Sequence, residues 1–160
     1  MAANPEPRPA PTGGEIYLKR VLKAPRDLVF KAWITPEHLV RWFGPDGFSV
    51  TSVEVDARAG GAWRIGIRSS DGMDCNMHGV YREVVRPERL VFTHIWEEGH
   101  PSAHHETLVT IKLSESEGQT TLIFHKAVLK DAVERQAQTT GWSQCLNRLD
   151  AYITEIKAKP

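Results

Sequence analysis

The spacing of hydrophobic residues changes three times along the chain. From Glu15 to Pro25 apolar and polar side chains alternate, which predicts a first strand. In PRDLVFKAWI, which starts at Pro25, and in TPEHLVRWF, which starts at Thr35, apolar residues recur at helical spacing instead. Proline suits the first position of a helix and threonine the position before it. We therefore predict two short helices, the second ending at Gly44.

The alternating pattern then returns in a series of strand-length segments. The gaps between them carry turn residues, such as SSDG at 69–72 and SESEG at 114–118. Gaps of hairpin length join antiparallel neighbours, so we predict a meander of six strands. The segments are 48–56, 61–69, 74–85, 88–97, 105–113 and 119–127.

Helical spacing reappears near the end of the chain. A single apolar stripe predicts one long helix that lies on another element. The element order predicts an α+β fold, in which a curved antiparallel sheet of about seven strands surrounds this helix. A cavity between sheet and helix is then the default functional site. The stripe consists of Trp142, Cys145, Leu146, Leu149, Tyr152, Ile153 and Ile156.

Composition separates a short arm from the rest of the chain. Residues 1–14, MAANPEPRPAPTGG, hold four prolines and two glycines and almost nothing to bury, which predicts a disordered arm. No second change of composition follows. We therefore predict one domain over residues 15–157.

Charge and cysteine content narrow the function classes. The 20 basic and 20 acidic residues cancel, and no run of like charge favours nucleic acid or an anionic membrane. No apolar run is long enough for membrane insertion or for a signal sequence, so we expect a cytoplasmic protein, monomeric or homodimeric. The only cysteines, Cys75 and Cys145, are far apart, which argues against a disulfide framework or a cysteine zinc site.

Several segments together resemble a known family. They are AWITPEHLVRWFGPDGF, GGAWRI, HGVYREVVRPERLVFTHIW, ETLVTIKL, TTLIFHKA and GWSQCLNRLDAYI. In this order, over about residues 15–156, they resemble the START-like helix-grip (SRPBCC) superfamily. Within it they resemble the branch related to the C-terminal domain of the activator of the ninety-kilodalton heat-shock chaperone's ATPase. The resemblance implies a long C-terminal helix gripped by an antiparallel sheet, with a hydrophobic cavity between them.

Strand alternation predicts which side chains face this cavity. Trp63 and Ile65 share one face of their strand, while Arg64 and Arg68 take the other. On segment 74–85 two phases are open, and we favour the one that turns Met77 inward. Plain core packing is the alternative interpretation for all of these residues. The predicted ligand-binding residues are Trp63, Ile65, Met77, Tyr81, Phe92, His94, Trp96, His105, Val109, Phe124, Trp142, Cys145 and Leu146.

The centre of the predicted cavity lies between Trp63, Trp96 and Trp142, with the imidazoles of His94 and His105 as its polar points. Such a lining suits an apolar or aromatic small molecule held by one or two hydrogen bonds. Two roles are open for Trp42 and Phe43. They could pack the helix pair against the sheet, or they could form part of the cavity entrance. We favour packing.

Other chemistries find less support in the sequence. Four histidines occur within 94–105, but the adjacent His104 and His105 point to opposite faces of a strand, so we predict no metal and no cofactor. No GxSxG, HExxH or glycine-rich phosphate loop is present. Two alternatives to ligand binding remain open. One is a co-chaperone-like protein interaction, and the other is a cyclase, hydrolase or self-sacrificing resistance activity in the same cavity.

Overall fold

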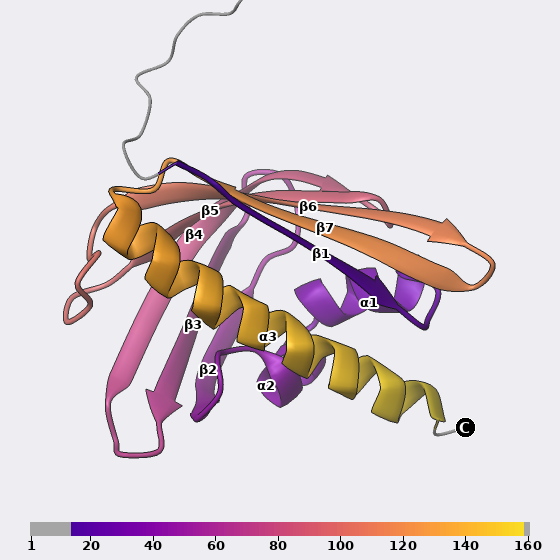
Figure 1. The fold of residues 1–160 in the computed structure, drawn as a ribbon, viewed down its shortest axis with the longest axis horizontal. Helices are drawn as coiled ribbons and strands as arrows, with labels where there is room; N and C mark the ends of the chain where they lie inside the picture. The colour runs from indigo at the N-terminus through magenta and orange to yellow at the C-terminus, as the bar shows by residue number, and fades with distance from the viewer. Residues whose placement is uncertain (1–13, 159–160) are drawn as a thin grey trace, which may run out of the picture.

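The computed structural model describes residues 14–158, so the predicted arm lies outside the described residues except for Gly14. These described residues form seven strands and three helices, shown in Figure 1. In order they are β1 (Ile16–Leu22), α1 (Arg26–Ile34), α2 (Pro36–Trp42), β2 (Phe48–Val55), β3 (Ala62–Ser69), β4 (Asp74–Val85), β5 (Arg89–Trp96), β6 (Glu106–Ser116), β7 (Gln119–Ala127) and α3 (Ala132–Ala158).

All seven strands belong to one antiparallel sheet in the order β1-β7-β6-β5-β4-β3-β2. The first strand therefore pairs with the last, and β1 and β2 form the two edges. Figure 1 shows the sheet curling around α3, which crosses its concave side, while α1 and α2 lie near the C-terminal half of α3. This arrangement confirms the predicted α+β helix-grip fold.

Alternating side chains explain why the sheet has one buried face. On β3, Trp63, Ile65 and Ile67 are buried, whereas Arg64 and Arg68 are exposed. The two arginines form ion pairs on the outer face, Arg64 with Glu97 at 2.9 Å and Arg68 with Asp74 at 2.7 Å. On β4 the favoured phase is confirmed, because Met77 and Tyr81 are buried.

Aromatic side chains join the helix pair to α3. The rings of Trp33 and Trp42 meet edge to face at 4.9 Å, and Phe43 meets Trp142 at 5.7 Å. Trp42 is fully buried and donates its indole N–H to the carbonyl of Ala32 at 3.0 Å. Trp42 is thus a packing residue, as we favoured.

One arginine fixes the turn between α2 and β2. A single guanidinium nitrogen of Arg148, on α3, donates to the carbonyl oxygens of Gly44, Pro45 and Phe48 at 2.8, 2.7 and 3.1 Å. Within the turn, the backbone N–H of Phe48 also donates to the carbonyl of Pro45 at 3.1 Å. Arg148 thereby positions the loop that begins β2 against the middle of α3.

The longest departure from the predicted elements is at the start of α3. The apolar stripe predicted a helix from Trp142, but α3 begins ten residues earlier at Ala132. The inward positions in this first part are the polar residues Glu134 and Gln138. A hydrophobic pattern could not reveal them, and their burial needs an explanation in the site.

Candidate functional site

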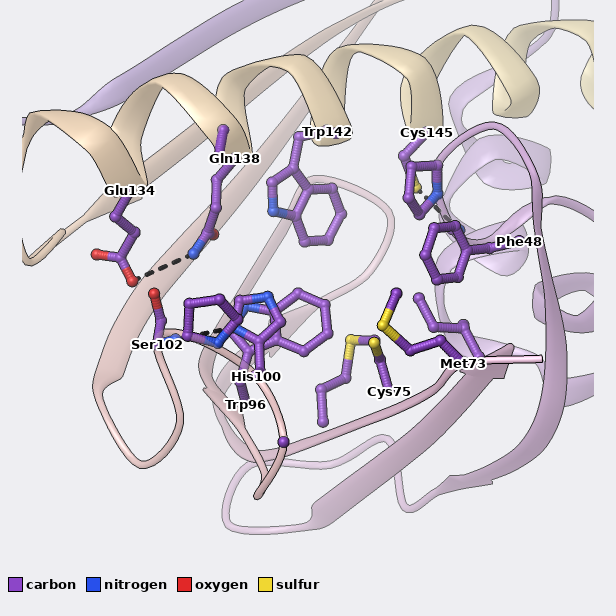
Figure 2. A pocket seen from close by; sticks show the side chains of 18 of the residues that line it. Phe48, Met73, Cys75, Trp96, His100, Ser102, Glu134, Gln138, Trp142 and Cys145 are labelled. Atoms are coloured by element: carbon purple, nitrogen blue, oxygen red, sulfur yellow. Dashed lines mark hydrogen bonds between the residues drawn. The ribbon is translucent and has the colours of Figure 1, made fainter. Parts of the chain in front are cut away.

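A cavity of about 540 Å³ lies between the first half of α3 and the sheet (Figure 2). Its helix wall is formed by Gln138, Gly141, Trp142 and Cys145. Gly141 and Trp142 each lie three or four residues from both Gln138 and Cys145, so all four lie on one side of α3. Gly141 lines the cavity, and a Cβ atom added there would meet no atom within 4 Å.

The opposite wall comes from three neighbouring strands. Ile67 on β3 pairs with Cys75 on β4, and Met77 on β4 pairs with Trp96 on β5. All four line the cavity. They are aliphatic, sulfur-containing or aromatic, so the sheet wall of the cavity is apolar, as is the part of the helix wall around Trp142 and Cys145.

The mouth of the cavity exposes apolar side chains to solvent. Met73, in the β3–β4 turn, and Val133, in the first turn of α3, are 54% and 79% exposed and both line it. Pro101 in the β5–β6 loop and Pro45 before β2 complete the rim. Apolar groups are thus available to a ligand from the rim to the interior.

Polar groups gather at one end of the cavity. In Figure 2, Glu134 and Gln138 descend from α3 toward Ser102 and His100 of the β5–β6 loop. The amide nitrogen of Gln138 donates to the Glu134 carboxylate at 3.3 Å, and the other carboxylate oxygen accepts from the backbone N–H of Lys130. The polar start of α3 therefore faces a polar end of the cavity.

Behind Gln138 lies a buried lysine. Lys126, on β7, is fully buried, and its ammonium group donates to the amide oxygen of Gln138. The same nitrogen lies 3.4 Å from Nδ1 of His94 and 5.5 Å from the centre of the Trp142 ring. Burial lowers the pKa of Lys126 from its ordinary 10.5 to about 7.

His94 fills the space between the three tryptophans. Its ring lies 5.8 Å from Trp63, 5.1 Å from Trp96 and 6.0 Å from Trp142. The cavity is therefore displaced from the predicted centre toward the start of α3, which corrects our expectation. Burial, and then the neighbouring Lys126 charge, lower the pKa of His94 well below its ordinary value.

One imidazole nitrogen and one indole nitrogen near this end have no hydrogen-bond partner among the described residues. Nε2 of His94 and Nε1 of Trp96 are buried, and no described residue accepts or donates at either atom. Buried polar atoms are normally satisfied, so such atoms beside a cavity are unusual. The His100 ring stacks on Trp96 with centres 4.0 Å apart and covers one side of it.

The structure divides the sequence-predicted ligand residues into groups. Four of them, Met77, Trp96, Trp142 and Cys145, line the open cavity. Another four surround a second void of about 20 Å³, room for about one water molecule: Trp63, Ile65, Tyr81 and Phe92. His94, Val109, Phe124 and Leu146 are buried in the core. Phe43, considered for the entrance, lines the open cavity.

His105 is placed differently from the prediction. The strand starts at Glu106, one residue later than the alternation indicated, so His105 belongs to the preceding loop. It is half-exposed, and its Nε2 lies 2.6 Å from the carbonyl oxygen of Val128. His105 therefore lies outside the cavity and is not one of its polar points.

Sequence reasoning missed the residues of the polar end, although a signal for them existed. Lys126 follows Leu122 and Phe124 at two-residue spacing, so strand alternation already pointed it inward. Gln138 and Glu134 extend the Trp142 stripe backward by four and eight residues. Both signals were hidden because charged and amide side chains are seldom buried.

Thiol and metal chemistry gain no support from the site. Burial raises the pKa of the Cys145 thiol to about 12, and the thiol sulfur accepts the backbone N–H of Gly44 at 3.3 Å. Such a cysteine behaves as a small apolar residue. Within residues 14–158 no three histidine, cysteine or acidic side chains are grouped so as to hold a metal ion. In that same range no helix combines the length and apolar character of a membrane span.

Comparisons with known proteins place these features in context. The model of a family described as activator of Hsp90 ATPase homolog 1-like protein matches residues 23–154. A solved structure from Chromobacterium violaceum is 30% identical, with a TM-score of 0.76, over 86% of this chain and 95% of that one. The AHSA1 protein from Silicibacter pomeroyi is 22% identical, with a TM-score of 0.79, over 88% and 97%. A protein from Nitrosomonas europaea is 23% identical, with a TM-score of 0.77, over 91% and 97%. A search of curated proteins found no match.

Proposed function

The chain belongs to the activator of Hsp90 ATPase homolog 1-like family, within the START-like helix-grip superfamily, and on this premise we propose that it binds a small hydrophobic molecule between α3 and the sheet. Proteins of this fold commonly bind hydrophobic ligands. The ligand would lie along Trp142 and Met77 and enter past Met73 and Val133.

The observation that carries this proposal is the open cavity itself. Its volume of about 540 Å³ falls within the range of roughly 300–1,000 Å³ that is typical of small-molecule sites. When an apolar ligand binds, the apolar surfaces of the ligand and of the cavity walls are removed from water. This burial contributes a favourable free energy of about 25 cal/mol per Å² of apolar surface, before the cost of association is subtracted. The apolar walls therefore favour a ligand whose body is aliphatic or aromatic.

Gly141 offers a direct test. We expect the uncharged dye N-phenyl-1-naphthylamine to bind the wild-type protein with a rise in dye fluorescence. The Gly141→Phe variant should lose this binding by at least about tenfold, because the new ring projects into empty cavity space rather than into other atoms.

The matched control is Gly141→Ala. Its methyl group leaves most of the cavity open, so dye binding should persist, while the helix gains about 0.5–1 kcal/mol of stability. If wild type and Gly141→Phe bind the dye equally, or if neither binds it, the proposed ligand site is wrong.

The family description favours a second candidate, a co-chaperone-like interaction. A cytoplasmic location and a part in stress responses belong with this candidate as predictions. The test is to add the purified protein to Hsp90 and measure ATP hydrolysis, with Gly141→Phe beside wild type. Unchanged ATP hydrolysis and no complex on a sizing column would remove the candidate.

A further inference from the structure

Behind the polar end of the cavity lies Lys126, a basic residue with no directly paired anion among the described residues. Lys126 is fully buried, and within residues 14–158 its ammonium group forms no ion pair. The Glu134 carboxylate partly offsets the lowering of the Lys126 pKa by burial, and Gln138 is hydrogen-bonded to both side chains. A buried charge is costly unless it is paired, so this arrangement leaves Lys126 incompletely stabilised.

The same end has more hydrogen-bond donors than acceptors. An ionised Lys126 can only donate in its 3.4 Å contact with Nδ1 of His94, and this contact favours the tautomer with the ring proton on Nε2. That N–H and the indole N–H of Trp96 are the two buried groups without a partner near the cavity. Three donors thus lie at or behind this end: the indole of Trp96 in the cavity lining, and the ammonium of Lys126 and the imidazole of His94 behind it.

We propose that the ligand is a hydrophobic carboxylic acid, whose carboxylate binds Lys126 at this end of the cavity while its apolar body lies between Trp142 and the β3–β5 wall. The inference rests on the proposed ligand-binding function. A carboxylate provides what the site lacks, since it is an anion and accepts several hydrogen bonds without donating any.

In the ligand-free structure the amide oxygen of Gln138 occupies the position on Lys126 that we assign to the ligand oxygen. Gln138 lines the cavity, and its amide oxygen is the acceptor that now faces Lys126. Binding requires the Gln138 side chain to turn away, so that a ligand oxygen takes its position on the ammonium group. Exchange of a neutral amide oxygen for a carboxylate oxygen keeps the hydrogen bond from the ammonium group and adds an opposite charge, so that the contact becomes an ion pair.

The test compares three ligands that differ only at one end: decanoic acid, decanol and decylamine. Each is titrated against bound N-phenyl-1-naphthylamine at pH 7. We expect wild type to bind the acid at least tenfold more tightly than the alcohol, and the amine most weakly. In Lys126→Met the acid should lose this advantage, while the dye and the alcohol bind as before.

Lys130 supplies the matched control, because it lies at the exposed rim of the same cavity. Lys130→Met should keep the preference for the acid. The inference is overturned if wild type binds acid and alcohol equally, if Lys126→Met keeps the preference, or if Lys130→Met alone loses it. Absence of dye binding in wild type would instead defeat the proposed function.

Proton uptake gives a readout that needs no variant. A bound carboxylate raises the pKa of Lys126, so at pH 8 binding of decanoate should draw close to one proton from the buffer, whereas binding of decanol should draw none. Calorimetry in two buffers with different ionisation enthalpies measures this number. Equal uptake with acid and alcohol would contradict the role of Lys126.

Discussion

A fully buried lysine makes the stability of this protein depend on pH. Lys126 has a pKa of about 7 in the folded protein against an ordinary value of 10.5. Between these values the unfolded chain binds a proton that the folded protein has released, so a higher pH favours folding. The cost of the buried charge is therefore fully present below about pH 7 and is relieved by about pH 10.5.

We predict that wild type gains several kcal/mol relative to Lys126→Met between pH 6 and pH 10, since each unit of pKa difference corresponds to about 1.4 kcal/mol. Urea unfolding of both proteins across this range measures the difference. Parallel stability curves would show that Lys126 stays charged, or has contact with water, in the folded state.

The same residue shows where sequence reasoning reached its limit. Alternation along β7 gives the direction of Lys126 as surely as that of Leu122 and Phe124. What it cannot give is that a lysine remains buried there, because burial depends on Gln138 and Trp142 from a helix many residues away. The cavity walls were thus partly predictable, while its polar end depends on tertiary contacts.

At the scale of elements, α3 is held to the α2–β2 turn by Arg148. One nitrogen donates to three carbonyl oxygens. Removal of the guanidinium would take this donor from all three, and among the described residues only the oxygen of Pro45 would keep a second one, the backbone N–H of Phe48 at 3.1 Å. The contact with Arg148 fixes the loop that carries Pro45 to the cavity rim.

We predict that Arg148→Met lowers the free energy of unfolding by about 2–3 kcal/mol, as expected for hydrogen bonds to a charged group. Arg41→Met is the control. Arg41, on α2, forms an exposed ion pair with Glu155, which lies on α3 as Arg148 does. Exposed ion pairs contribute less than about 1 kcal/mol to the free energy of unfolding. Chemical denaturation compares the two, and equal losses would rule out the special role of Arg148.

Strands were predictable where an alternating segment runs between turn residues. The segment 119–127 was predicted with the bounds of β7, and 74–85 with those of β4. The start of α3 was missed because Glu134 and Gln138 face a cavity rather than a packed core. The failure of the hydrophobic pattern and the location of the site therefore have one cause.

At the scale of the whole molecule, ligand binding and folding are linked. The cavity joins α3 to strands β3, β4 and β5, so a bound molecule contacts elements that separate on unfolding. A ligand at one hundred times its Kd stabilises the folded state by about 2.7 kcal/mol.

We therefore predict that decanol at this concentration raises the Tm of wild type by several degrees and leaves Gly141→Phe unchanged. Differential scanning fluorimetry at matched protein concentration measures both. An equal rise in the two proteins would indicate binding elsewhere on the surface.

The distribution of tryptophans has a practical consequence. Trp96 and Trp142 border the open cavity, whereas Trp33, Trp42 and Trp63 lie outside it. Imidazole rings touch both cavity indoles, His100 stacked on Trp96 and His94 edge-on to Trp142. A bound ligand changes the polarity around two of the five tryptophans. The fluorescence of the other three stays unchanged as a constant background. The protein thus carries its own optical reporter, whose emission can be used to screen unlabelled metabolites.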